Sequence, residues 1–287
     1  MEKAYPELTI KLEHVTTKGD RILDAPLAKI GGKGLFTKEL EEGLLTGQFD
    51  LAVHSLKDMP TQLPAGLTLA AITKREAIQD AFVSVRYANW QALPPGAKVG
   101  TSSLRRKAQL LALRPDLQVL DLRGNVGTRV HKLEAGAYDA IVLAAAGLER
   151  LGLSNYIRAR FAPTEMLPAV GQGALAVETR ANDERINSFL AVLNDMPTRQ
   201  ATIAERAFMQ RVEGGCQVPV GAFAEVHGEN LHMTAVIASL DGKRVFKGEK
   251  TGQVTEAQAM GIHLAEQLLE AGAREVLQEI GLLTAEK

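Results

Sequence analysis

The middle of the chain repeats one order of segments, and this order constrains the fold most. Short apolar runs at 98–101, 119–122 and 140–144 predict strands, and helical patterns follow the first two, over 104–113 and ending near Glu134. Strand–loop–helix order is typical of α/β layers with parallel strands, and ligands bind beyond the carboxyl ends of such strands. We therefore expect an α/β fold whose sites lie at strand ends, with Ser102 or Ser103 capping the first helix.

The region before these segments also predicts alternating strands and helices. An alternating pattern at Leu8–Val15 predicts a strand, and apolar spacing over 35–45 predicts a helix. Further buried strands are expected at 50–55 and 67–73. A stretch rich in proline and glycine at 163–173 predicts a crossover or hinge.

The last part of the chain has a different pattern. Helical patterns at 183–193 and 198–211 precede three strands joined as hairpins, with Asp241-Gly242 as one turn. These strands are expected at 218–226, 231–239 and 244–248, and closing helices at 256–269 and 274–280. The pattern predicts a small α+β module, in which the apolar residues around His263 pack in the core.

Composition excludes several classes of protein. The formal net charge is −1, from 33 basic and 34 acidic residues, whereas a general nucleic-acid binder usually carries a basic surplus. No apolar run is long enough for a membrane span, and the N-terminus has no apolar signal core. The single cysteine cannot form an intrachain disulfide, and the histidines follow no metal-binding spacing. We expect a cytoplasmic protein without a metal.

Two polar segments in the first part could carry chemistry. Lys29 and Lys33 lie in the glycine-rich KIGGKG loop, which could bind an anion but lacks a P-loop ending, so a solvated loop is the alternative. Ser55, Lys57 and Asp58 follow a predicted buried strand that a proline stops. Asp58 could form an ordinary ion pair with Lys57, stabilise a developing cation or carry a proton to a leaving amine.

Arginines recur near strand exits and helix starts in the repeated region. Arginine pairs bidentately with carboxylates and keeps its charge, so several in one cleft would suit a polyanionic ligand, whereas single arginines are usually solvated surface. They are Arg105, Arg106, Arg123, Arg129 and Arg150. Near the end, two glycines precede Cys216, which could be a reactive or modified thiol or a buried apolar residue.

Seven segments, in order along nearly the whole chain, resemble porphobilinogen deaminases, also called hydroxymethylbilane synthases. The segment ERAFMQRVEGGCQVPVG at 205–221 is the most specific of them. The others are KIGGKGLFTK, DLAVHSLKDMP, VGTSSLRR, LRGNVGTR, LAAAGLERLG and LPAVGQGA.

The resemblance implies a transferase of porphyrin (haem) biosynthesis. Such enzymes join four porphobilinogen molecules head to tail into hydroxymethylbilane and release ammonia, on a dipyrromethane cofactor that Cys216 would hold through a thioether. Asp58 would stabilise the electron-poor azafulvene and help move protons, and Phe36 could cover a pyrrole ring. Residues that would bind the acidic cofactor and substrate are Lys29, Lys33, Phe36, Ser55, Lys57, Thr101, Ser102, Ser103, Arg105, Arg106, Arg123, Gly124, Arg129, Arg150 and Gln172.

The resemblance also implies three domains and a monomer that binds neither nucleic acid nor membrane. Two domains like periplasmic binding proteins, at 1–73 with 174–193 and at 79–167, would flank the cleft, and a small α+β domain at 196–287 would carry the cysteine. Two crossovers, near 74–78 and 168–173, would form the hinge. Family members normally start with a strand and helix holding an Arg-x-Ser-x-Leu-Ala motif. This sequence begins inside the end of that helix, so we expect domain one to expose strand edge and apolar surface.

Two alternatives to a working deaminase remain open at the level of the sequence. The α/β units and cleft arginines alone would also suit a non-catalytic anion-binding module, and a shortened deaminase could be catalytically impaired. Cys216 separates a deaminase from a simple binding module, because a binding module has no use for a covalently attached dipyrromethane.

Overall fold

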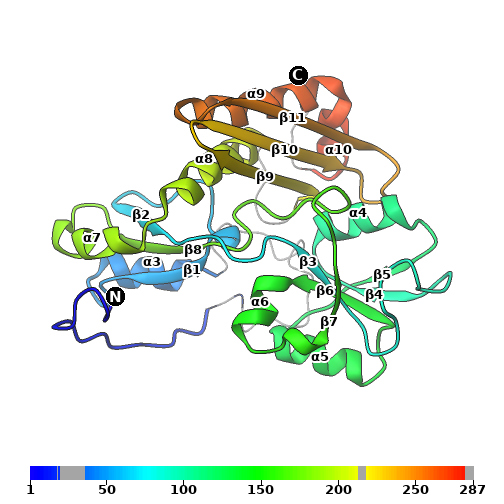
Figure 1. The fold of residues 1–287 in the computed structure, drawn as a ribbon, viewed down its shortest axis with the longest axis horizontal. Coiled ribbons are helices and arrows are strands. Elements are labelled where there is room, and N and C mark those ends of the chain that lie inside the picture. The colour runs from blue at the N-terminus through cyan, green and yellow to red at the C-terminus, as the bar shows by residue number, and fades with distance from the viewer. Residues whose placement is uncertain (18, 20–35, 213–217, 282–287) are drawn as a thin grey trace.

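Three β-sheets with flanking helices make up the computed structural model, which describes residues 1–17, 19, 36–212 and 218–281. Figure 1 shows one sheet at the left, a second at the lower right and a third across the top. This arrangement confirms the predicted fold class, two α/β units followed by a small α+β unit. No helix among the described residues is long and apolar enough to cross a membrane.

The first sheet has the order β1-β8-β2, and both of its strand pairs are antiparallel. Its strands are β1 (Ala52–Ser55), β2 (Leu67–Ile72) and β8 (Leu175–Arg180), and its helices are α3 (Lys38–Leu45) and α7 (Glu184–Leu190). The parallel arrangement predicted from the middle of the chain does not extend to these strand pairs. β8 comes from far along the sequence, and it pairs with both earlier strands.

The predicted strand at Leu8–Val15 is also wrong. These residues form no strand in the structure, and the Leu12 side chain is 81% exposed. An alternating pattern makes a strand only where a partner strand completes the hydrogen bonds. In the described part of the chain, β1 pairs with β8 alone, and Val53 on β1 is 57% exposed.

The second sheet has five strands in the order β5-β4-β6-β3-β7. The strands β4 (Lys98–Gly100), β5 (Gln118–Leu120) and β6 (Ala140–Ala144) are parallel, as predicted, whereas β3 (Asp80–Val83) runs antiparallel to β6 and β7 (Ile157–Arg160). The helices are α4 (Leu104–Leu113), α5 (Val126–Glu134) and α6 (Ala145–Arg150). Ser103 caps α4, as expected, because its side chain accepts a hydrogen bond from the Arg106 amide.

The third sheet is an antiparallel meander of β9 (Val220–His227), β10 (Asn230–Ala238) and β11 (Val245–Gln253). The helices α8 (Met196–Arg211) and α9 (Ala257–Leu268) pack on it, and α10 (Arg274–Glu279) follows. Gly261 lets α8 and α9 approach closely, since a Cβ there would lie 2.1 Å from the Ala204 carbonyl oxygen. Leu264, Leu268 and Leu269 beside His263 are buried, which confirms their predicted place in the core.

Short helical turns join these elements. They are η1 (Leu56–Asp58), η2 (Ser154–Tyr156), η3 (Ala191–Leu193), η4 (Val254–Glu256) and η5 (Leu269–Ala273). The turn η1 directly follows β1, so its polar residues lie at the carboxyl end of that strand.

Candidate functional site

Asp58 lies on the surface because its apolar neighbours anchor the turn η1. Leu56 and Met59 are buried, and the Met59 amide donates to the Leu56 carbonyl at 3.1 Å. The Leu56 amide donates to the Ala174 carbonyl at 3.0 Å, which ties the turn to the chain entering β8. Ser55 is half-buried at the end of β1, and Asp58 is exposed. The fold therefore presents an exposed carboxylate at a strand end, where the sequence predicted one.

Lys57 extends from the same turn towards the second sheet. Burial lowers the pKa of its ammonium group, and the nearby Asp58 carboxylate opposes that effect. Arg105 and Arg106 act in the same direction as burial because their charges have the same sign. Lys57 is therefore close enough to both arginines to form one electrostatic group with them.

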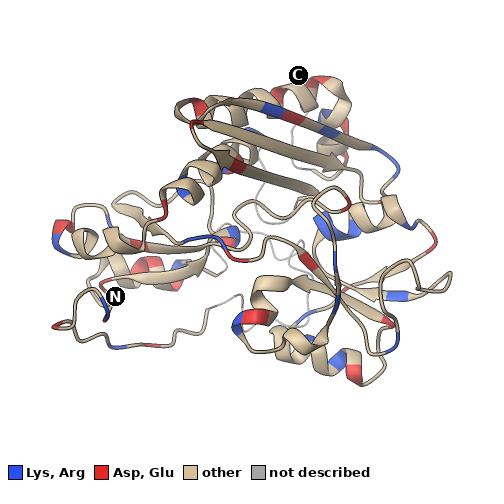
Figure 2. Cartoon of the chain, in the orientation of Figure 1, with Lys and Arg blue, Asp and Glu red and all other residues tan. Residues whose placement is uncertain are grey.

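Asp80 holds these two arginines together, and the sequence analysis did not identify it. Its fully buried carboxylate accepts from Arg105 Nη1 at 2.6 Å and from Arg106 Nε at 2.9 Å. Burial alone would raise the pKa of Asp80, but the two guanidinium groups outweigh it and hold the pKa well below its usual value. Figure 2 shows basic residues at the start of α4 and an acidic residue at the start of the nearby β3.

Gln172 joins the same cluster from the crossover. It is buried, and its amide nitrogen donates to the Ile78 carbonyl at 2.6 Å and to Asp80 Oδ1 at 3.1 Å. Within the described residues, its Oε1 atom has no hydrogen-bond partner. A buried acceptor of this kind can receive an N–H group from a ligand.

The three predicted hydroxyl residues bond to the backbone around the end of β4. Thr101 Oγ1 accepts from the Ser103 amide at 3.2 Å, and Ser102 Oγ donates to the Leu122 carbonyl at 2.8 Å. Ser103 caps α4. These bonds fix the loop that leads into Arg105 and Arg106.

Arg123 and Arg129 add charge at the neighbouring strand end. Gly124 has φ of +114°, and a Cβ there would lie 2.7 Å from Thr128 Cγ2, so only glycine fits this turn. Arg129 Nε donates to the Gly124 carbonyl at 2.6 Å. Burial and the like charges of Arg106 and Arg123 lower the pKa of Arg129 to about 10, while Asp58 opposes them. Arg129 thus remains charged near neutral pH, within the field of Asp58.

Two further predicted residues lie in other elements. Arg150, at the end of α6, donates to the Gly173 carbonyl at 2.7 Å and so holds the crossover. Phe36 precedes α3 and is 36% exposed. Lys29, Lys33 and Cys216 lie outside the described residues, so their predicted roles stay predictions.

Arg75 and Glu205 form a joint between the three sheets, and the sequence analysis missed both. Glu205 on α8 is fully buried and pairs bidentately with Arg75, at 2.6 and 2.9 Å. The Gly171 amide of the crossover and the Ala224 amide of β9 also donate to Glu205, at 2.7 and 2.8 Å. Glu205 lies inside the ERAFMQRVEGGCQVPVG segment, but nothing in that pattern indicates its partner.

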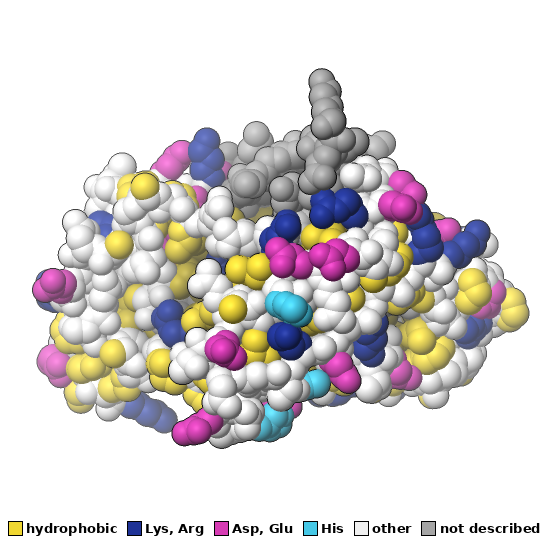
Figure 3. Space-filling view, turned by 90° about the horizontal axis from the view of Figure 1, so that it is seen from above, with side chains coloured by type: hydrophobic (Ala, Val, Ile, Leu, Met, Phe, Trp, Pro, Cys, Tyr) yellow, Lys and Arg dark blue, Asp and Glu magenta, His cyan; other side chains and the backbone are white. Residues whose placement is uncertain are grey.

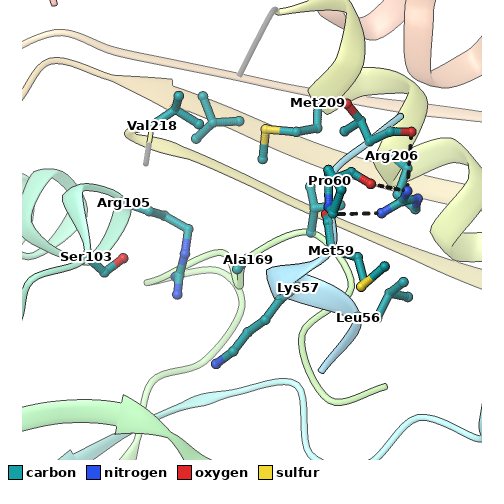
Figure 4. Close-up of a pocket in the computed structure, with 13 residues that line it drawn as sticks. Leu56, Lys57, Met59, Pro60, Ser103, Arg105, Ala169, Arg206, Met209 and Val218 are labelled. Carbon is teal, nitrogen blue, oxygen red and sulfur yellow. Dashed lines mark hydrogen bonds between the residues drawn. The ribbon is translucent and has the colours of Figure 1, made fainter. Parts of the chain in front are cut away.

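A cavity of about 60 Å³ lies where the three units meet. Figure 4 shows Lys57 and Arg105 extending to one side of it, opposite Met209 and Val218. Val218 is two positions after Cys216 in the sequence. A cavity of this volume suits water, so it would have to widen to hold a larger ligand.

Elsewhere on the described surface, charges of both signs are mixed. Figure 3 shows basic and acidic side chains interspersed over the upper face. Within the ranges that the structure describes, no three histidine, cysteine or acidic side chains come together as a metal site.

Comparisons with solved structures find binding proteins that resemble part of this fold. A nutrient binding protein from Burkholderia cenocepacia bound to methionine aligns at 14% identity and a TM-score of 0.40, over 56% of this chain and 77% of that chain. An ABC transporter periplasmic substrate-binding protein from Coxiella burnetii aligns at 17% identity and a TM-score of 0.37, over 55% and 77%. At this level of similarity, their ligands say nothing about the ligand of this chain.

Sequence models of one family cover most of the chain. Residues 1–188 match the dipyrromethane cofactor-binding domain of porphobilinogen deaminase, and residues 200–270 match the C-terminal domain of the same enzyme. The first match contains Asp58 and the cationic cluster, and the second contains Cys216. The chain therefore belongs to the porphobilinogen deaminase family.

Proposed function

We propose that this chain condenses four porphobilinogen molecules head to tail into hydroxymethylbilane, with release of ammonia at each step, on a dipyrromethane held by Cys216. Family membership supports the substrate and the cofactor. The observation that carries the proposal is the exposed carboxylate of Asp58 at a strand end, close enough to Arg129 for its charge to act on that guanidinium, as the charges of Arg106 and Arg123 also do. A simple anion-binding site has no need for a free carboxylate among its arginines.

The charge of the cluster suits the substrate. Each porphobilinogen carries an acetate and a propionate, so every added unit brings two negative charges. Bidentate pairing with guanidinium groups fixes both the position and the orientation of such carboxylates. Arg105 and Arg106 share the single carboxylate of Asp80, which leaves positive charge in excess. The excess balances the acidic side chains of a growing product.

The residues also fit the cofactor. Gln172 Oε1 is buried without a hydrogen-bond partner among the described residues, and a pyrrole N–H is a donor of the kind it lacks. Lys57, Ser103 and Arg105 line the same cavity as Val218, which follows the Cys216 segment. When bound, the dipyrromethane supplies the free pyrrole carbon on which the chain grows. The cationic side chains would hold its carboxylates, and Gln172 would orient its rings.

Asp58 would act on the incoming substrate. Loss of ammonia leaves positive charge on the substrate carbon and its ring, and a fixed carboxylate nearby stabilises that charge. A preorganised electrostatic group in an active site typically lowers the barrier by about 3–4 kcal/mol. The same carboxylate can accept the pyrrole N–H or carry a proton to the leaving amine. Lys57, beside it, would pair with a substrate carboxylate.

Replacing Asp58 tests the mechanism. We expect Asp58→Ala and the isosteric Asp58→Asn to abolish turnover of porphobilinogen while the protein keeps its heat-unfolding midpoint. Asp50→Asn is the matched control, because Asp50 is an exposed acid just before the same strand. Normal turnover by Asp58→Asn would remove the carboxylate from the mechanism.

Mass spectrometry tests the cofactor separately. Protein made in cells that supply porphobilinogen should be heavier than its sequence by two pyrrole units, and Cys216→Ser should have its unmodified mass. An unmodified wild-type protein would favour an impaired form or an anion-binding module. Pigment retained by Cys216→Ser would contradict the assignment of the thiol.

A further inference from the structure

Arg206 binds the segment that leaves the Asp58 turn. From α8, its guanidinium donates to three consecutive backbone carbonyls, those of Met59 at 3.4 Å, Pro60 at 2.6 Å and Thr61 at 3.3 Å. Figure 4 shows Arg206 beside this segment, with dashed lines marking the bonds. Charge-assisted bonds from one planar group to successive carbonyls fix the path of a backbone.

On the other side of the Asp58 turn, the buried Leu56 and Met59 and the bond from the Leu56 amide to the Ala174 carbonyl anchor it. One backbone bond closes it, from the Met59 amide to the Leu56 carbonyl, and Pro60 has no amide proton with which to make another. Asp58 is exposed, so packing does not fix its side chain. The position of its carboxylate therefore depends also on the backbone just after it, which Arg206 holds.

The helix that carries Arg206 belongs to a different part of the molecule from Asp58. α8 packs against β9 and α9 in the third unit, and Glu205, the adjacent residue, pairs with Arg75. The Asp58 turn follows β1 in the first unit. Arg206 thus links the candidate catalytic carboxylate to the C-terminal sheet.

We propose that Arg206 is a positioning residue, which holds the Asp58 carboxylate in a fixed place relative to the C-terminal sheet during each condensation. The proposal rests on the catalytic role of Asp58 given above. Arg206 acts through the Met59–Thr61 backbone, so its loss should slow the chemical step more than it weakens substrate binding.

Arg199 provides a matched control on the same helix. It is seven residues before Arg206, two helical turns, and so lies on nearly the same face. It also donates to backbone carbonyls of the first unit, those of Leu69 and Ala70, both at 2.9 Å. Those carbonyls belong to β2, the strand that follows the Asp58 turn in the sequence. Both arginines therefore anchor α8 to the first unit, but only Arg206 holds the catalytic turn.

The experiment compares Arg206→Gln, Arg206→Lys and Arg199→Gln in the full-length protein carrying its cofactor, with intact mass used to check occupancy. Turnover of porphobilinogen gives kcat and KM, and heat unfolding gives the midpoint. We expect Arg206→Gln to lower kcat about 10- to 100-fold with KM changed less than about 3-fold, since small misplacements of a catalytic group have effects of this size. Arg206→Lys should recover part of the loss, and Arg199→Gln should keep kcat within about 2-fold of wild type.

Each outcome decides the proposal. Equal kcat for Arg206→Gln and Arg199→Gln, at similar unfolding midpoints, would overturn it, as would a loss confined to KM. If Arg206→Gln does not fold, the comparison of Arg206→Lys with Arg199→Lys decides in the same way. Asp58→Asn separates the two proposals: turnover by that variant refutes the role of Asp58, whereas a dead Asp58→Asn with a normal Arg206→Gln refutes only the role of Arg206.

Discussion

Removing the charge of Glu205 should destabilise the protein more than any surface substitution. The carboxylate is fully buried and accepts four hydrogen bonds, two from Arg75 and one each from the Gly171 and Ala224 amides. Glu205→Gln keeps the volume but puts an NH₂ group against these donors. It also leaves the Arg75 side chain, only 10% exposed, without its counter-charge.

The size of the effect follows from the burial. Breaking a buried pair by removing one partner typically costs about 3–5 kcal/mol, because the remaining charge stays desolvated. A loss of 1 kcal/mol lowers the unfolding midpoint by about 2–4 °C in domains of about 150–250 residues. We therefore expect the midpoint of Glu205→Gln to fall by roughly 6–20 °C.

Glu266→Gln is the matched control. Glu266 on α9 pairs with Arg211, which is on α8 like Glu205, at 3.2 Å. Both side chains are well exposed, so breaking this pair should cost about 0–1 kcal/mol of stability. Differential scanning calorimetry of both variants, with the cofactor present, measures the comparison. Equal midpoints for Glu205→Gln and Glu266→Gln would refute the assignment of Glu205 as the buried joint.

Two further predictions concern the second unit. The arginines lower the pKa of Asp80 in the folded protein below its value in the unfolded chain, which is about 4. The ionised Asp80 should therefore contribute its full stabilisation above about pH 4, and this stabilisation should be lost as the pH falls further. Wild type should therefore lose stability on acidification more steeply than Asp80→Asn, as urea titrations at several pH values would show; parallel profiles would contradict the pairing. Gly124→Ala should cost about 1–3 kcal/mol, because φ is +114° and Thr128 lies in the way. Gly136→Ala, which also has positive φ but nothing within 4 Å, should cost less in the same urea titration.

Local patterns predicted the helices and most strands well, since their signals lie within one segment. The apolar spacing over 104–113 gave α4 with its Ser103 cap, and the Asp241-Gly242 turn joins β10 to β11. The prediction of a strand at Leu8–Val15 was wrong, because an alternating pattern describes a single strand and does not show whether a partner strand lies beside it. Strands β3 and β7 went unpredicted, although β1, β4 and β5 are no longer and were predicted.

The candidate site was predictable where function depends on residue type at a strand end, and unpredictable where it depends on contacts distant in sequence. Asp58 and the arginines were identified by position. Asp80, Arg75 and Glu205 were not, because a buried carboxylate between guanidinium groups is defined by segments far apart: Arg75 and Glu205 are 130 residues apart. Charged residues are usually expected on the surface, whereas these three are largely buried. A sequence indicates burial only through the periodicity of apolar residues, so it does not reveal a buried charged residue.

The four bonds at Glu205 have a mechanical consequence. One carboxylate receives donors from the chain linking the first two sheets, from the returning crossover and from the third sheet. If the sheets rotate apart to admit a longer product, the displacement is smallest at the point they share. Glu205 is thus placed to serve as a pivot, because the bonds that it accepts from all three parts would change least in such a rotation.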